Sequence, residues 1–258
     1  MGIHFGITQI VSSFALLMIR WYGQGMDTYY NCSILLIGIS GMLTVIPVLY
    51  LYRRDRAARV TGGLVAVPGT GRGNAGNYLL LLLMGAAMAQ FGNLIVAFIQ
   101  LFLQSTAYQD SFSKITEGKN LPEMIYWIGI VAPVAEEAVF RWLIYLRLRD
   151  YFRVPVSVIL SALLFGIYHG NVVQFIYATL LGCLFAYFME MTGSLYASVL
   201  LHIGANVWSL VYSELGLWLL QTSAIGVLTG INFLLLAVLF AGGRYFTRLG
   251  KMRNARWI

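Results

Sequence analysis

Charged residues are scarce in this sequence: they make up only 10% of its 258 residues, whereas 59% are hydrophobic. Ordinary soluble domains carry about 25% charged residues. Several uncharged apolar runs reach the roughly 20 residues that a helix needs to cross a lipid bilayer. This composition argues against a soluble domain and predicts an all-α, polytopic helical membrane protein.

Cysteine and histidine are also scarce, with two and three residues. Cys32 and Cys183 fall inside apolar runs, where thiols behave as small buried hydrophobic groups, so we expect neither a disulfide nor a cysteine metal site. The first apolar run, residues 4–21, has no basic segment before it and no small-residue cleavage site after it. We therefore expect it to be a retained span. His4, at its start, is expected at the membrane interface without a functional role.

About eight segments are apolar enough to be transmembrane helices. The fifth and sixth are separated only by a short break at Gly170 and Asn171. The predicted spans are residues 4–22, 31–52, 77–104, 122–147, 155–171, 172–190, 194–213 and 217–241.

The basic residues lie mainly between spans and near the C-terminus. Of 17 Lys and Arg residues, 13 fall in residues 53–77, 147–153 and 244–256. Cytoplasmic segments of membrane proteins carry an excess of Lys and Arg. The pattern predicts that both termini are cytoplasmic, and it accounts for the net charge of +7 without a nucleic-acid partner.

The fourth predicted span carries Glu136, Glu137 and Arg141, the charged residues between Met124 and Ile144. A charge at the bilayer centre costs at least about 2.5–3.5 kcal/mol, and such residues are functional candidates by default. At 100° per residue, Glu137 and Arg141 share a helix face and can form an ion pair, whereas Glu136 points elsewhere. One glutamate is then neutralised and its neighbour is free for chemistry, although a pair that only fixes helix packing has the same pattern.

His169 and His202 lie in two further apolar segments, so three helices can direct Glu136 and two imidazoles into one interior cavity. Phe165 lies one turn before His169 and can exclude water from one side. Asn206 lies one turn after His202, so both side chains can present donors to a developing negative charge. Each of these residues alone also fits a structural role in hydrogen bonding or packing.

Three motifs, in this order, resemble those of the CPBP family, which comprises the CAAX prenyl proteases and the bacteriocin-processing (Abi) proteins. EEAVFR at residues 136–141 is similar to the family's E-E-x-x-x-R, FGIYH at 165–169 to F-x-x-x-H, and HIGAN at 202–206 to H-x-x-x-N/D. The stretch TGSLYASVLLH from Thr192 resembles the approach to the last motif. The resemblance covers residues 122–208.

This resemblance implies an intramembrane endopeptidase. Glu136 would be the general base that activates water, and His169 would hold that water. His202 and Asn206 would form the oxyanion hole. The substrate would be a membrane-associated or lipidated peptide or protein, and the compact chain fits a bacterial plasma-membrane member.

The resemblance also implies residues that support the site. Glu137 and Arg141 would be the structural pair that keeps Glu136 in place, with Phe165 packed beside them. The family is often labelled as metalloproteases, but no H-E-x-x-H signature occurs here. A metal bound through Glu136 would also consume the obvious base, so we expect no cofactor, with zinc as the alternative. The zinc ligands would then be Glu136, His169 and His202.

We expect three regions in the chain: an N-terminal scaffold of three spans (1–121), a catalytic core of four helices (122–213), and a last span with a basic cytoplasmic tail (214–258). Two other functions use the same residues. A proton-coupled transporter would employ the Glu, Arg and His cluster as a relay, although no internal repeat typical of transporters is visible. A catalytically inert membrane scaffold is the other alternative. The sequence makes no prediction about oligomeric state.

Overall fold

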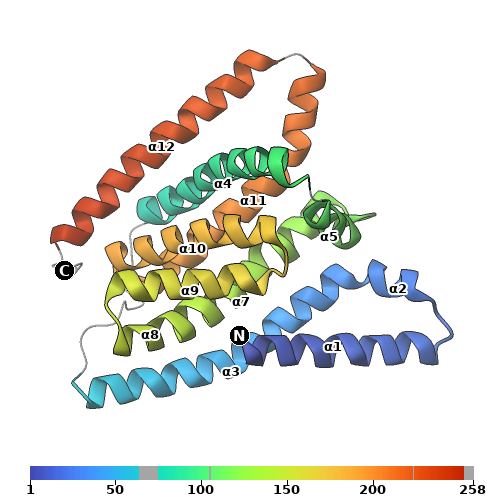
Figure 1. Cartoon of the computed structure of the whole chain (residues 1–258), viewed down its shortest axis with the longest axis horizontal. Helices are drawn as coiled ribbons and strands as arrows, with labels where there is room; N and C mark the ends of the chain where they lie inside the picture. The colour runs from blue at the N-terminus through green and yellow to red at the C-terminus, as the bar shows by residue number, and fades with distance from the viewer. Residues whose placement is uncertain (64–74, 105, 223, 253–258) are drawn as a thin grey trace.

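A computed structural model describes residues 1–63, 75–104, 106–222 and 224–252, and these residues form helices with no β-strand among them (Figure 1). In chain order the helices are α1 (Gly2–Trp21), α2 (Met26–Asn31), α3 (Ser33–Thr61), α4 (Ala75–Leu103), α5 (Ala107–Thr116), α6 (Leu121–Met124), η1 (Ile125–Val131), α7 (Ala132–Glu137), η2 (Ala138–Tyr145), α8 (Leu146–Tyr151), α9 (Val154–Tyr168), α10 (Val172–Thr192), α11 (Leu195–Gln221) and α12 (Ile225–Met252).

Six of these helices are long and apolar enough to cross a membrane: α1, α3, α4, α10, α11 and α12. The shorter apolar helix α9 and the charged segment α6 to α8 account for the other two predicted spans. Large apolar side chains such as Phe14, Phe98 and Phe233 are exposed on the outer helices. Exposed apolar surface of this kind marks a face in contact with lipid. The chain is a polytopic helical membrane protein, as predicted.

The fourth predicted span is one uninterrupted helix, residues 121–151, in which two π-helical segments alternate with α-helical ones. Pro133 lies just after the first π segment. Proline has no N–H to donate and its ring clashes with the carbonyl one turn earlier, and a wider turn accommodates both. The second π segment begins directly after Glu137. Such segments are rare and occur frequently at functional sites.

The break between α9 and α10 lies where the sequence predicted it. Gly170 has a φ of 74°, in the left-handed region that glycine adopts readily. The Asn171 side chain accepts a hydrogen bond from the Gln174 backbone N–H at 2.8 Å and caps α10. These two residues turn the chain back on itself, and α9 and α10 pack side by side.

The predicted start of the last span was wrong. We expected a helix over residues 217–241, but α11 continues to Gln221 and α12 extends from Ile225 to Met252. Gly216 keeps a negative φ, so it does not end the helix. The predicted boundary between residues 213 and 214 therefore falls inside α11, and the three-region division stays a prediction.

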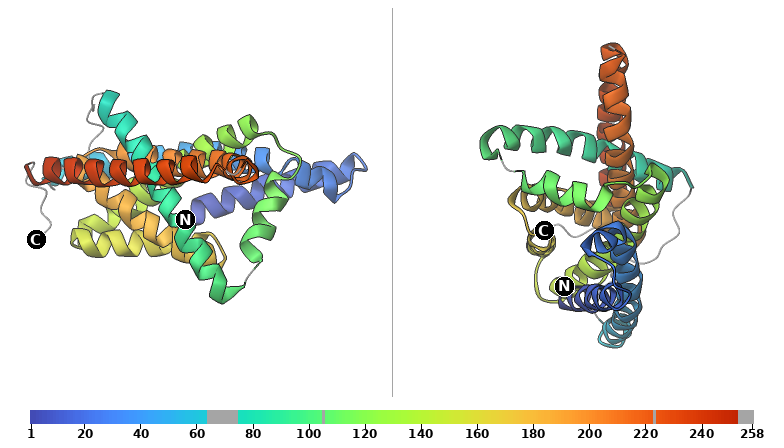
Figure 2. Two further views of the ribbon diagram at one scale, coloured as in Figure 1. Left: turned by 90° about the horizontal axis from the view of Figure 1, so that it is seen from above. Right: turned by 90° about the vertical axis from the view of Figure 1, so that its right-hand side faces the viewer.

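Helix α4 crosses α11 obliquely, and Figure 2 shows it lying across the direction of α12. The two backbones touch at glycines. A Cβ on Gly85 would lie 2.0 Å from the Leu201 carbonyl oxygen, and a Cβ on Gly204 would lie 2.0 Å from the Leu82 carbonyl oxygen. Small residues at such crossings allow membrane helices to approach closely. This contact holds α11, which carries one of the three motifs, against α4.

We expect Gly204→Ala to destabilise the protein by about 1–3 kcal/mol, because the new methyl group must push two helix backbones apart. Gly230→Ala on α12 is the matched control, since nothing lies within 4 Å of a Cβ at that position. That change should leave stability equal or slightly higher. Thermal unfolding of both purified variants in detergent measures the difference, and equal midpoints would contradict the close packing of α4 on α11.

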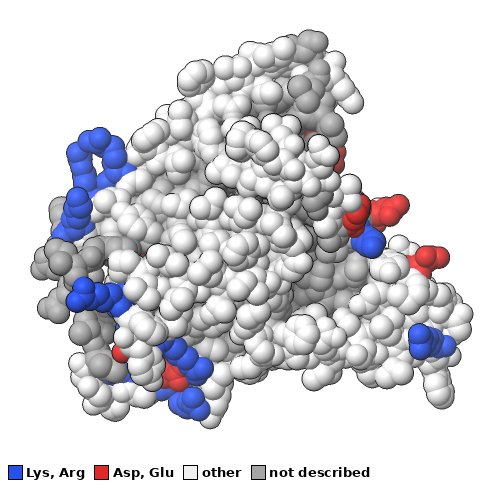
Figure 3. Space-filling view, viewed as in Figure 1, with Lys and Arg blue, Asp and Glu red and all other residues white. Residues whose placement is uncertain are grey.

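The basic residues gather at the end of the molecule where α3, α8 and α12 terminate (Figure 3). Ion pairs tie α8 and its neighbours together there. They are Arg59–Asp150 (2.7 Å), Arg147–Asp55 (2.6 Å) and Arg149–Glu190 (3.0 Å). The cytoplasmic location of this end and of both termini stays a prediction, and Arg72, Arg253 and Arg256 lie outside the described residues.

Candidate active site

The predicted ion pair between Glu137 and Arg141 is present and fully buried. Arg141 Nε lies 3.2 Å from Glu137 Oε2, and neither side chain is exposed to solvent. The Arg141 guanidinium also lies 4.8 Å from the centre of the Phe165 ring, and its Nη2 donates to the Gly182 carbonyl at 3.4 Å. The arginine is therefore held between η2, α9 and α10 at the centre of the fold.

His202 joins this pair to the second glutamate. Its Nδ1 lies 3.0 Å from Glu137 Oε1, and its Nε2 lies 3.7 Å from Glu136 Oε2. The Glu136 side chain is 17% exposed, whereas that of Glu137 is 0% exposed. Glu137 is thus enclosed by Arg141 and His202, whereas Glu136 borders accessible space. The helix geometry predicted this division between the two carboxylates.

His169 lies at the C-terminal end of α9, half-buried, with Nδ1 2.8 Å from the Phe165 carbonyl oxygen. A carbonyl oxygen only accepts, so Nδ1 carries the proton and the neutral ring has a bare Nε2. That atom has no hydrogen-bond partner within the described parts of the chain. Neither a hydrogen bond nor an ion pair between described residues joins His169 to Glu136.

Phe165 lies between the two motif histidines. Its ring meets His169 edge-on at 4.9 Å and His202 edge-on at 5.6 Å, and the side chain is buried. His202 also stacks on Phe185 at 5.1 Å. Aromatic rings on these sides keep water away from the imidazoles.

The Asn206 side chain makes its hydrogen bond outside this cluster. Its amide donates to the Ile128 carbonyl in η1 at 3.0 Å, one turn beyond His202 on α11. The contact links α11 to the π-helical segment. One amide N–H is used there and the second is available, so its predicted role in an oxyanion hole stays a prediction.

The third histidine, His4, has polar and aromatic partners of its own in the structure. His4 is buried, with Nδ1 2.8 Å from Thr44 Oγ1 and its ring 5.3 Å from the Tyr168 ring. Helix α1 packs along α3, and this contact buries the His4 side chain within the protein. Its expected position at the membrane interface stays a prediction. No sequence motif surrounds His4, so only the tertiary contact between α1 and α3 shows that it is buried.

The zinc ligands named from the sequence were Glu136, His169 and His202. No group of three His, Cys, Asp or Glu side chains suited to hold a metal ion occurs within residues 1–63, 75–104, 106–222 and 224–252. These three side chains therefore do not form such a group. Glu136 Oε2 lies 3.7 Å from His202 Nε2, whereas the His169 ring packs against the Phe165 ring.

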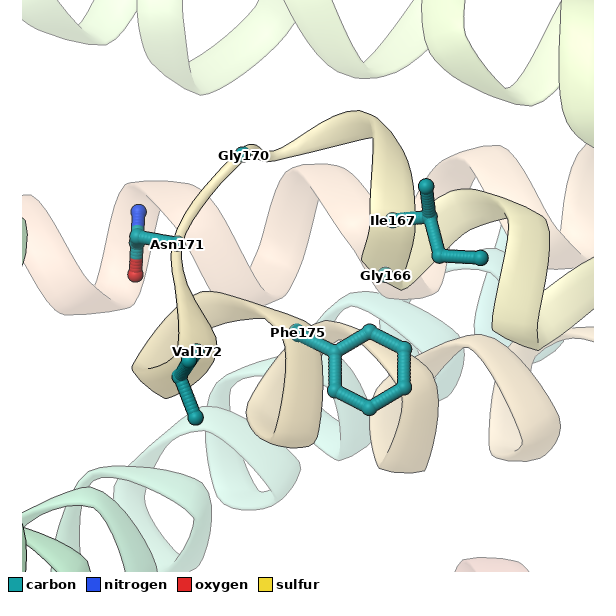
Figure 4. A pocket seen from close by; sticks show the side chains of 6 residues that line it. All are labelled: Gly166, Ile167, Gly170, Asn171, Val172 and Phe175. Carbon is teal, nitrogen blue, oxygen red and sulfur yellow. The ribbon is translucent and has the colours of Figure 1, made fainter.

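A hollow of about 230 Å³ opens at the turn between α9 and α10 (Figure 4). It is lined by Gly166, Ile167, Gly170, Asn171, Val172 and Phe175. None of the predicted catalytic side chains lines it, although His169 precedes Gly170 directly. The hollow therefore lies at the C-terminal end of α9, next to His169.

Comparison with protein families gives a match for residues 119–208, to the family described as type II CAAX prenyl endopeptidase Rce1-like. The matched segment contains all three motifs and extends from the turn before α6 into α11. Comparisons with curated proteins and with solved structures found no match. Residues 119–208, which hold the buried Glu–Arg–His cluster, thus match the CAAX protease family that the motifs resemble.

Proposed function

We propose that this protein is an intramembrane endopeptidase that hydrolyses a peptide bond with water activated by Glu136 and His169. The observation that carries the proposal is the different surroundings of two adjacent glutamates. Glu137 is fully buried against Arg141 and His202, whereas Glu136 is accessible and free of the arginine. A general base needs a carboxylate that is held in place and can still reach water.

In the proposed reaction, a water molecule donates one hydrogen bond to Glu136 and one to the bare Nε2 of His169. Glu136 takes the proton as the water oxygen attacks the carbonyl carbon of the substrate. The carbon–nitrogen bond then breaks, and Glu136 returns the proton to the departing amine. General acid–base catalysis of this kind contributes about 10²–10⁴-fold to the rate.

The negative charge that develops on the carbonyl oxygen would be stabilised by His202 and Asn206. The His202 Nε2 lies 3.7 Å from Glu136 Oε2, on the side of the ring where the oxyanion would form. Asn206 would contribute the amide N–H that Ile128 does not use. A single oxyanion donor is worth about 10²–10³-fold in kcat.

For the substrate, we propose a membrane-associated or lipidated peptide or protein. The description of the matched family names CAAX prenyl endopeptidases, and the accessible carboxylate lies within a bundle of membrane-spanning helices. We also propose that the protein resides in a bacterial plasma membrane with the basic end of Figure 3 in the cytoplasm, because Lys and Arg concentrate on that side of membrane proteins.

We expect cleavage to survive a metal chelator, because no step of this reaction uses a metal. Purified protein in detergent would be incubated with a peptide library that includes farnesylated CAAX peptides, with and without EDTA. His169→Ala should abolish the cleavage under both conditions. Cleavage lost with EDTA and restored by zinc would show that the metal-free reaction is wrong while the peptidase activity stands.

A further inference from the structure

A groove of about 490 Å³ lies where α12 packs against α4 and α10, and α12 contributes most of its lining. We call it the α12 groove. Ligand sites typically have volumes of about 300–1,000 Å³, so this one is large enough to hold a small molecule. None of the predicted catalytic side chains lines it. The α12 groove is therefore separate from the candidate active site.

The lining of the α12 groove changes from apolar to basic along the helix. Leu239 and Phe240 line one part of it, and Phe188 of α10 adds a further apolar surface. Arg244 and Arg248 follow at one-turn intervals after Phe240, and both are exposed. At 1.5 Å per residue, Leu239 and Arg248 are about 14 Å apart along α12. The two arginines thus lie toward the C-terminal end of α12, where the basic residues of the molecule gather (Figure 3).

The two arginines of the groove have no carboxylate partner. Neither forms an ion pair with an acidic side chain in the part of the chain that the structure describes. Three other arginines at the same end, by contrast, are each paired with an acid: Arg59, Arg147 and Arg149. An arginine guanidinium binds a phosphate group through two parallel N–H···O hydrogen bonds. Arg244 and Arg248 are therefore free to hold an anion at the point where the apolar lining ends.

Gly243 keeps the middle of the groove open. A Cβ at this position would have Phe188 Cζ, 3.9 Å away, as its nearest neighbour, which is ordinary van der Waals contact. Helix packing therefore does not require a glycine here. Because the glycine has no side chain, the space beside Phe188 is available to a hydrocarbon chain.

We propose that the α12 groove binds one molecule of an anionic phospholipid. An acyl chain lies against Phe188, Leu239 and Phe240, and Arg244 and Arg248 hold the phosphate. A phospholipid has the same order of a hydrocarbon chain followed by an anionic group. Basic pockets between the helices of membrane proteins bind anionic lipid headgroups in this way. The inference goes beyond the proposed reaction and does not depend on it.

The first test measures the contribution of charge. Native mass spectrometry of the purified protein would compare the binding of dioleoylphosphatidylglycerol with that of dioleoylphosphatidylcholine, which has the same acyl chains without the net charge. We expect the anionic lipid to bind about tenfold more tightly, and Arg244→Gln/Arg248→Gln to lose this preference. The control Arg53→Gln/Arg54→Gln removes two exposed charges from α3 at the same end of the molecule and should keep it. Equal binding of the two lipids by the wild type, or an equal loss in the control, would overturn the proposal.

The second test fills the groove. Gly243→Leu should weaken the binding of phosphatidylglycerol by about tenfold, because the leucine side chain takes the place of part of the acyl chain. Gly230→Leu is the matched control on the same helix, since nothing lies within 4 Å of a Cβ there, and it should bind like the wild type. Unchanged binding by Gly243→Leu would place the acyl chain elsewhere and overturn the proposal. Displacement of the bound lipid by a farnesylated CAAX peptide would assign the groove to the substrate and would overturn it as well.

Discussion

Glu136→Gln should reduce peptide cleavage by about 10²–10⁴-fold while the protein stays as stable as the wild type. Glutamine has the same shape but cannot take a proton from water. Stability should be retained because Glu136 is not part of the ion pair with Arg141 and borders accessible space. Initial rates with a farnesylated CAAX peptide, measured beside thermal unfolding in the same detergent, separate the two effects.

Glu214→Gln is the matched control for this experiment. It removes a carboxylate of the same size from an exposed position on α11, so both the rate and the unfolding midpoint should match the wild type. A Glu136→Gln enzyme that cleaves at the wild-type rate would rule out this carboxylate as the base. An equal loss of activity in Glu214→Gln would show that the assay responds to charge rather than to the site.

Arg141→Met should destabilise the protein by about 3–5 kcal/mol, because it leaves the fully buried Glu137 without its cationic partner. The loss includes the contact of the guanidinium with Phe165. The double variant Glu137→Gln/Arg141→Met removes both charges and should recover much of this loss, since replacing a buried pair by neutral groups is often tolerated.

The control for the buried pair is Arg147→Ala, which breaks an ion pair with Asp55 on the molecular surface. Exposed pairs contribute about 0–1 kcal/mol, so this variant should be nearly as stable as the wild type. Unfolding in mixed detergent micelles measures all three variants. If Arg141→Met and Arg147→Ala lose the same stability, the buried pair does not have the structural importance assigned to it.

The directions of the charged side chains in the fourth span were predictable, because a rotation of 100° per residue points two adjacent glutamates to different sides of a helix. Glu137 and Arg141 pair at i,i+4 although the second π segment begins between them. The π segments themselves were not predicted. The first lies directly before the turn that contains Pro133, and the sequence shows the proline but not how the helix accommodates it.

The last span was misplaced for a related reason. Residues 214–221 contain Glu214 and Gly216, which are common near helix ends, and the sequence offered no other signal for the boundary. The structure keeps both residues in helical conformation. Backbone conformation at a single glycine depends on its neighbours in space, so the boundary moved by about two turns.

The candidate site was predictable as far as the motifs reach. Glu137, Arg141 and His202 form one buried cluster in the structure, and the partly exposed Glu136 borders it. The burial of His4 was not predicted, because it depends on the packing of α1 against α3, which brings residues 40 positions apart into contact. Asn206 was assigned a role without knowledge of the Ile128 carbonyl, whose availability depends on the π-helical backbone.

The most direct test of the central claim is mass spectrometry of a farnesylated CAAX peptide incubated with the wild type and with Glu136→Gln in lipid vesicles. The account predicts a new peptide C-terminus inside the substrate with the wild type and intact peptide with the variant. Intact peptide in both samples, together with solute or proton movement across the vesicle membrane that only the wild type supports, would contradict the peptidase and favour a transporter built on the same charged cluster.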